Sequence, residues 1–180
     1  MTSFYGIDLS MTGTGLASFD MGGGWDVATV SVPAEDRSPG AFIDRAETIA
    51  AKIIAWCDPH EGDVIAMEGP ALQAKSSQLD RMFALWWFTY RALRDHHAEP
   101  HIIPPSVVKQ LATGKGNANK DSVLIDTVKR VPRANVTNNN EADAVWLAVA
   151  AGHFDGAAIL SLPVAHLTGL AKLMGPVKAS

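Results

Sequence analysis

The spacing of hydrophobic residues changes at about residue 39, and each part of the pattern predicts its own kind of structure. Before that point, residues 4–9, 15–21 and 25–32 are short apolar or alternating runs, and glycines fill the turn at 22–24. Runs of this length joined by tight turns predict three strands of an antiparallel meander. After it, residues 41–56 repeat apolar side chains at helical spacing and predict an amphipathic helix.

The rest of the chain mixes short strands with helices. Strands are predicted at 64–67 and 101–103, and helices at 77–96, 105–112, 120–130, 141–153 and 164–173. A meander that continues as helix, strand, helix and strand predicts a mixed sheet with helices on both faces. With 180 residues, 47% of them hydrophobic, we expect a single α/β domain over 1–180 whose residues 174–180 form a flexible tail.

The composition indicates in which cellular compartment the protein works. Cys57 is the one cysteine, so no disulfide can form within the chain. The sequence shows neither a secretory leader nor a clean run of about 20 apolar residues. We therefore expect a cytoplasmic protein that has no membrane partner.

The net charge argues at first against a nucleic-acid partner, because it is -4 and the pI is about 5.8. The charges are distributed unevenly, however. Residues 1–70 hold eleven acidic and three basic side chains, whereas residues 105–133 hold six basic and two acidic ones. The basic segment is typical either of a solvated helix face or of a surface that binds phosphates.

Three acidic residues stand in or at the ends of predicted elements. Asp8 lies within the first strand, Glu68 ends the strand at 64–67, and Asp143 lies at the start of an almost uncharged helix. Taken singly, each also suits a solvated strand end or a helix start, where the dipole favours acids. Brought together, they would repel one another unless cations neutralised them. Mg²⁺ or Mn²⁺ bound to such oxygens can support phosphodiester hydrolysis.

Four separated motifs follow one another along the chain. They are Gly6-Ile7-Asp8 with residues 10–15, Ala66-Met67-Glu68, residues 105–109 leading to 114–120, and Glu141-Ala142-Asp143-Ala144. In order and spacing they resemble the RuvC-type Holliday junction resolvases, a family with a ribonuclease-H-like fold. The resemblance spans about residues 4–153, and its most discriminating part is the segment from Lys109 to Lys120.

The resemblance implies a fold and an active site. The fold is α/β, a mixed five-stranded sheet of three antiparallel and then two parallel strands, flanked by helices. Asp8, Glu68 and Asp143 would be catalytic carboxylates that hold two Mg²⁺ or Mn²⁺ ions per site. Lys109 and Lys120 would contact the scissile strand or stabilise its developing charge. The implied activity is that of a crossover junction endodeoxyribonuclease acting in DNA recombination and repair.

The resemblance also implies partners. Lys75 falls where the family often has a lysine near DNA, and Lys115 belongs to the same basic segment as the other expected DNA-binding lysines. The family acts on four-way junctions as a homodimer, here in the cytoplasm of a bacterium or a phage-infected host; no helicase partner can be named. The helix after Glu68 usually helps form the dimer. Its Trp86 and Trp87, with Phe88, predict either packing against a second subunit or a helix buried all round.

Two positions depart from the family pattern. Where members commonly carry a fourth carboxylate, three residues before the last aspartate, this chain has Asn140. Asn140 could still offer a carbonyl oxygen, but we favour Glu141 as the replacement metal-binding acid. The second departure is the segment Ala71-Leu72-Gln73, where some relatives place an aromatic residue that stacks on unpaired bases. Its absence predicts a relaxed junction or sequence preference.

Other readings remain open at this stage. The segment from Asp8 to Gly15 also resembles the phosphate-binding turn of actin-like ATPases and sugar kinases, although 180 residues accommodate one lobe of such an enzyme. A non-catalytic junction-binding protein on the same scaffold is a further alternative, suggested by Asn140. The histidines lack the spacing of a zinc site, because adjacent helical residues such as His96 and His97 do not face one ligand.

Overall fold

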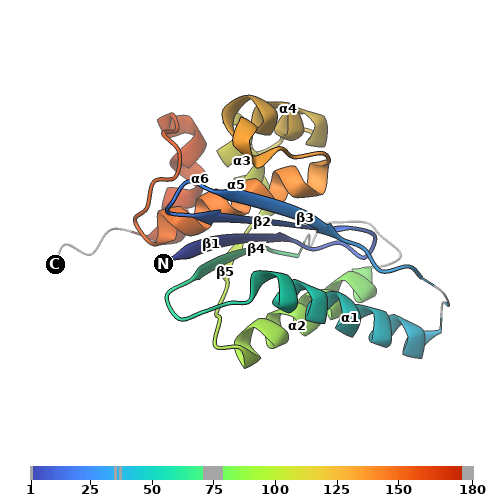
Figure 1. The fold of residues 1–180 in the computed structure, drawn as a ribbon. Helices are drawn as coiled ribbons and strands as arrows, with labels where there is room; N and C mark the ends of the chain where they lie inside the picture. Colours follow the sequence, from blue (N-terminus) through green and yellow to red (C-terminus); the bar gives the residue numbers. More distant parts are fainter. Residues whose placement is uncertain (1, 35, 37, 71–78, 176–180) are drawn as a thin grey trace.

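A mixed five-stranded sheet organises the chain in a computed structural model that describes residues 2–34, 36, 38–70 and 79–175 (Figure 1). Its strands are β1 (Ser3–Asp8), β2 (Thr14–Asp20), β3 (Trp25–Val30), β4 (Val64–Glu68) and β5 (His101–Ile103), in the order β3-β2-β1-β4-β5. The pairs β1–β2 and β2–β3 are antiparallel, whereas β1–β4 and β4–β5 are parallel. The expected sheet of three antiparallel and two parallel strands is confirmed.

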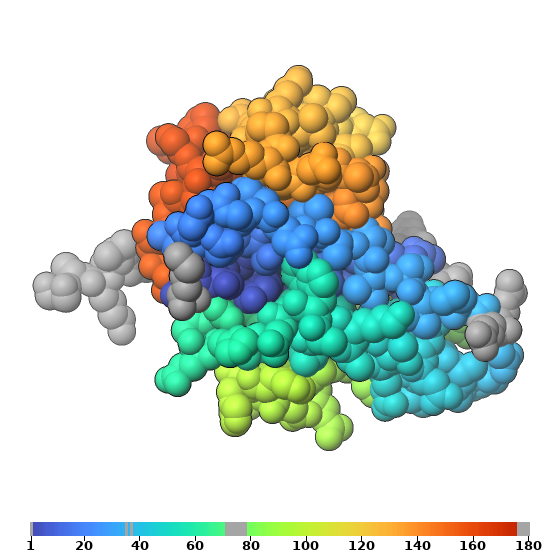
Figure 2. All heavy atoms as spheres, in the orientation of Figure 1, coloured from blue at the N-terminus to red at the C-terminus, as the bar shows by residue number. Residues whose placement is uncertain are grey.

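Helices cover both faces of this sheet. One face carries α1 (Pro39–Cys57) and α2 (Leu79–Asp95); the other carries α3 (Pro105–Thr113), α4 (Lys120–Arg130), the short 3-10 helix η1 (Pro132–Ala134), α5 (Asn139–Phe154) and α6 (Val164–Met174). Figure 2 shows the blue segments of the sheet between the orange helices of one layer and the green helices of the other. None of the helices in the described ranges is long and apolar enough to cross a membrane.

The end of the chain differs slightly from expectation. Helix α6 continues to Met174, so that residue does not belong to a tail, and residues 176–180 lie outside the described residues. Lys75 and the segment 71–73 also lie outside them. The DNA contact expected of Lys75 and the relaxed preference expected from residues 71–73 therefore remain predictions.

Two hydrophobic cores lie on opposite faces of the sheet. In β1, Phe4 packs into the core beneath α5, whereas Ile7 packs into the core formed with α1 and α2. Successive strand residues point to opposite faces, so a sheet covered by helices on both sides needs apolar residues at nearly every position. This explains why β1 and β4 read as continuous apolar runs rather than as alternating ones.

Helix α5 lies unusually close to the sheet because two strand residues have no side chain. A Cβ on Gly6 would come within 1.9 Å of the Ala144 carbonyl oxygen, and one on Gly15 within 2.0 Å of the Asn140 carbonyl oxygen. Any other residue at either place would push the helix away. The two glycines therefore set the height of α5 above β1 and β2, and with it the height of Asp143.

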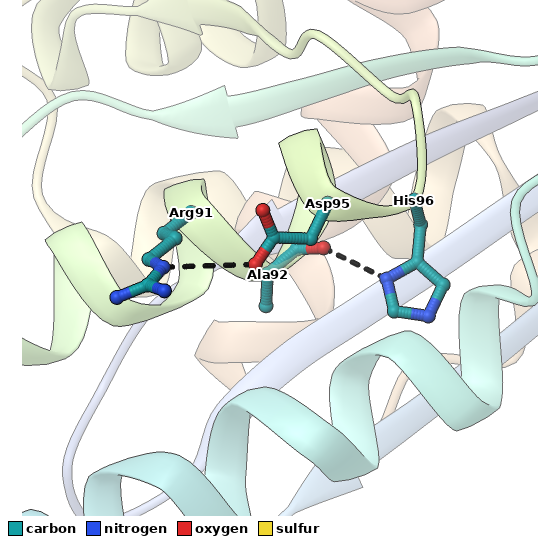
Figure 3. A network of polar contacts seen from close by, with 4 residues as sticks. All are labelled: Arg91, Ala92, Asp95 and His96. Atoms are coloured by element: carbon teal, nitrogen blue, oxygen red, sulfur yellow. Dashed lines mark hydrogen bonds and ion pairs between the residues drawn. The ribbon is translucent and has the colours of Figure 1, made fainter.

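The C-terminal end of α2 is polar and exposed (Figure 3). Arg91 Nε lies 3.6 Å from Asp95 Oδ2, and His96 Nδ1 donates to the Ala92 carbonyl at 2.9 Å. An exposed ion pair of this kind stabilises a helix little. The chain then reverses at His97, which has a left-handed φ of 59°.

Candidate active site

Asp8 and Glu68 end two neighbouring parallel strands. Ile7 pairs with Met67 in the β1–β4 register, so the next residue of each strand, the carboxylate, falls at the same edge of the sheet. Asp8 is buried, with 6% of its surface exposed. The two side chains are close enough that the charge of Glu68 raises the pKa of Asp8.

Trp86 fixes the position of Glu68, although sequence reasoning considered this tryptophan only as a packing residue. Its Nε1 donates to the Glu68 carbonyl oxygen at 3.0 Å. The Gly69 amide, next along the chain, donates to the Ile103 carbonyl at 2.8 Å. These two bonds hold the carbonyl and the amide of the peptide unit that directly follows the Glu68 side chain. An indole placed 18 residues later could not have been assigned this role from spacing alone.

Asp143 reaches the same site from α5, the helix that packs on one face of the sheet. It lies in the buried stretch of α5, and 7% of its surface is exposed. Its negative charge raises the pKa of both Asp8 and Glu68. The structure thus brings together the three carboxylates that the sequence singled out.

The protonation of these carboxylates reflects burial and mutual repulsion. Burial, then the charges of Glu68 and Asp143, hold the pKa of Asp8 well above its usual value. Burial and the charge of Asp143 raise the pKa of Glu68 to about 7, and burial raises that of Asp143 to about 6. At neutral pH the cluster therefore retains protons that a cation would displace.

Two lysines oppose these upward shifts. The positive charges of Lys120 and Lys109 both lower the pKa of Glu68 and of Asp143. Lys120 is the first residue of α4, which begins where the Asn119 side chain accepts a hydrogen bond from the Ser122 amide at 2.8 Å. Lys109 lies on α3, and that helix ends at Gly114 with a left-handed φ of 77°. The middle of α3 and the start of α4 thus present one lysine each to the carboxylates.

Lys115 has a different position. It lies in the segment between α3 and α4 and is exposed. It is absent from the charges that shift the three carboxylates. This placement suits a contact with a ligand outside the carboxylate cluster.

The structure does not bring Glu141 to the other carboxylates, against our expectation. Its Oε1 accepts from Thr29 Oγ1 at 2.8 Å, and its Oε2 accepts from the Thr137 amide at 2.7 Å and from Thr137 Oγ1 at 2.9 Å. Burial acts to raise the pKa of Glu141, but these hydrogen bonds outweigh it and lower the pKa. The side chain joins β3 to the start of α5, about 200° round the helix from Asp143.

Asn140 is also engaged elsewhere. Its Nδ2 donates to the Gly13 carbonyl at 2.6 Å and ties the β1–β2 turn to α5. The turn is held from its other side by Arg45, which donates to the carbonyls of Met11 and Val32. The turn that follows Asp8 is therefore fixed at both flanks.

The donor set suits a divalent cation, although it is not a closed cage. Among the residues that the structure describes, no three His, Cys, Asp or Glu side chains are arranged to hold a metal ion by themselves. Asp8 and Glu68 form a pair, and Asp143 acts on that pair electrostatically. Carboxylate oxygens are the ligands that Mg²⁺ and Mn²⁺ prefer, and carboxylates with raised pKa values gain most from a nearby cation.

Comparisons with known proteins identify relatives over most of the chain. The chain is 31% identical over 147 residues to the crossover junction endodeoxyribonuclease RuvC of Paenarthrobacter aurescens, covering 80% of this chain and 77% of that protein. The RuvC of Mycolicibacterium smegmatis is 30% identical over 148 residues, covering 80% and 79%. No family model matches the chain.

The fold also has a solved counterpart. The structure of Thermus thermophilus RuvC in complex with a Holliday junction substrate aligns with a TM-score of 0.63 at 18% identity, covering 88% of this chain and 98% of that chain. At this identity the likeness establishes the fold. It extends across the sheet and both helical layers.

Proposed function

We propose a function from the premise that this chain belongs to the RuvC family of crossover junction endodeoxyribonucleases. It cuts four-way DNA junctions, and its active site consists of Asp8, Glu68 and Asp143 with bound Mg²⁺ or Mn²⁺. The observation that carries this proposal is the convergence of buried Asp8 and Asp143 with half-buried Glu68, opposite two lysines. A cluster of this kind is unfavourable without a cation and useful with one.

Each carboxylate has a role that its position supports. Asp8 and Glu68 offer adjacent oxygens from one sheet edge, and Asp143 offers another from α5. Two divalent ions per site would supply an activated water and stabilise the oxygen that leaves the phosphorus. The products would be a 5′ phosphate and a 3′ hydroxyl.

The lysines would hold the DNA strand in place. Lys109 and Lys120 stand beside the carboxylates and suit a scissile phosphate, while exposed Lys115 suits a phosphate farther along the strand. Each phosphate neutralised releases counterions, so junction affinity should fall as salt rises. This local basic surface accounts for DNA binding by a chain whose net charge is -4.

The aromatic residues of α2 favour a homodimer. Trp87 is 59% exposed and Met82 38% exposed, so the alternative of a helix buried all round is wrong. Trp86 stacks on Tyr90 with centroids 5.2 Å apart, and Trp87 meets Trp86 edge-on at 4.8 Å. Large exposed aromatic rings of this kind are typical of protein interfaces. A second copy of the chain is the partner we propose for this surface.

Membership of the RuvC family argues against the reading as an ATPase or sugar-kinase lobe. An experiment distinguishes a junction-cutting enzyme from a non-catalytic junction-binding protein. Wild-type protein and Asp8→Asn would be compared on a synthetic four-way junction and on a duplex of equal length, with Mg²⁺ or with EDTA. We expect Mg²⁺-dependent cleavage of the junction by the wild type alone, and junction binding by both proteins. Binding without any cleavage would establish the non-catalytic reading instead.

A further inference from the structure

The first turn of α5 contains three consecutive polar residues, and two of them make side-chain hydrogen bonds to other segments. Asn140 donates to the Gly13 carbonyl, and both carboxylate oxygens of Glu141 accept hydrogen bonds. The preceding residue, Asn138, caps the helix by accepting from the Glu141 amide at 3.0 Å. Asn139 is the remaining polar residue of this turn.

Asn139 carries a buried oxygen without a partner. Its Oδ1 is one of three buried side-chain atoms in the described part of the chain that make no hydrogen bond, the others being Thr89 Oγ1 and His153 Nε2. A buried carbonyl left unpaired destabilises the fold, because it has lost its hydrogen bond to water without gaining another. Such an atom in a native structure calls for an explanation, and an absent ion is one of the ordinary ones.

The helix places this oxygen on the side of Asp143. Residues four apart in a helix lie about 40° from each other, so Asn139 and Asp143 share a face. Helical side chains also lean towards the N-terminus, which directs the Asp143 carboxylate back over the turn that contains Asn139. The Asn140 amide group donates to Gly13 in the β1–β2 turn, and Glu141 accepts from Thr29 of β3.

We propose that Asn139 Oδ1 is a neutral oxygen ligand for the divalent cation held with Asp143. The inference rests on the proposed function and names the residue that completes the donor set there. Amide carbonyls are ordinary ligands of hard cations. A neutral oxygen adds a ligand without adding another negative charge to carboxylates that already repel one another.

The first test measures Mn²⁺ binding by calorimetry, using the full chain without DNA. Asn139→Leu keeps the approximate shape of the side chain and removes the oxygen, so we expect Mn²⁺ affinity to fall about 10-fold or more. Asn139→Asp restores an oxygen and should bind Mn²⁺ at least as tightly as the wild type. An unchanged affinity in Asn139→Leu would overturn the inference.

The second test measures the melting temperature of the metal-free protein. If Asn139 had a purely structural role, its replacement would lower this temperature. Asn139→Leu should melt no lower than the wild type, because it removes an unpaired carbonyl from a buried place. The matched control, Asn140→Leu, should melt lower because it leaves the Gly13 carbonyl without its donor. A loss of melting temperature in Asn139→Leu equal to that control would show that Asn139 has a protein partner, and would contradict the proposal.

A third variant separates the failure of this inference from that of the proposed function. If Asp8→Asn loses Mn²⁺ binding and Asn139→Leu keeps it, the metal site stands and the role of Asn139 does not. If Asp8→Asn binds Mn²⁺ as tightly as the wild type, the proposed active site is wrong, and the role of Asn139 is wrong with it.

Discussion

Asp8 and Glu68 end adjacent parallel strands, and the charge of Glu68 adds to burial in holding the pKa of Asp8 well above its usual value. Without a cation, the raised pKa values of the two carboxyl groups favour retention of a proton, which a bound cation would displace. This relationship links stability, metal binding and activity, and the first two predictions follow from it.

The substitution Asp8→Asn should stabilise the metal-free protein at pH 8. The folded-state pKa values of Asp8, Glu68 and Asp143 are raised, so their protonated forms favour the fold at low pH and that stability is lost as pH rises through about 6 to 7. Removing one charge should add about 1–3 kcal/mol to the free energy of unfolding at pH 8. Denaturant unfolding at pH 5 and pH 8 measures this.

The increase in the free energy of unfolding caused by Asp8→Asn should be smaller at pH 5, because the carboxyl cluster is largely protonated there in both proteins. Asp26→Asn is the matched control, because Asp26 is exposed on β3. Its effect should stay within about 0.5 kcal/mol at both pH values. Equal effects of the two substitutions would mean that the carboxylates do not repel one another.

Junction cleavage at fixed Mg²⁺ should rise between pH 6 and pH 8. Cation binding needs deprotonated carboxylates, and the pKa of Glu68 is about 7 and that of Asp143 about 6. Lys120→Ala removes a charge that lowers both values, so its rate profile should move to higher pH. Lys172→Ala, on exposed α6, should leave the profile in place. A Lys120→Ala profile that keeps the wild-type midpoint would exclude the electrostatic role of this lysine.

The substitution Trp87→Ser should weaken the proposed dimer. Ile125→Ser is the control, since Ile125 is similarly exposed, 52% against 59% for Trp87, but lies on α4 in the other helical layer. Light scattering at micromolar concentration should give a dimeric mass for the wild type and the control, and a lower mass for Trp87→Ser. A monomeric wild type would refute the dimer, and a dimeric Trp87→Ser would place its interface elsewhere.

The substitution Glu141→Gln should destabilise the fold by about 1–3 kcal/mol, because it replaces a carboxylate that accepts from Thr29 and from Thr137 twice. Since the pKa of Glu141 is lowered, its contribution is present at neutral pH and lost as pH falls through that pKa. Thr29→Val removes one of the three bonds and should have a smaller effect. Thermal unfolding at pH 7 compares them, and an unchanged Glu141→Gln would show that the bonds add nothing.

Much of the architecture could be predicted because it depends on local periodicity. The meander, the amphipathic helix α1 and the strand that ends at Glu68 follow from the spacing of apolar residues and from turn residues. The partner of Glu68 in the fold, Trp86, could not be predicted, since its hydrogen bond depends on how α2 packs beneath the sheet. The hydrogen bonds of Glu141 could not be predicted for a similar reason, because Thr29, which donates to it, lies 112 residues away.

The sequence by itself determined the elements, their order, the basic segment, and the three carboxylates with Lys109 and Lys120. Only the tertiary structure decided that these groups converge, that burial and repulsion raise the pKa values of the carboxylates, and that Asn139 carries a buried oxygen without a hydrogen bond. The physical reason is that convergence depends on contacts between distant segments. The parallel pairing of β1 with β4 and the close approach of α5 over Gly6 create that geometry, and no periodicity along the chain encodes either.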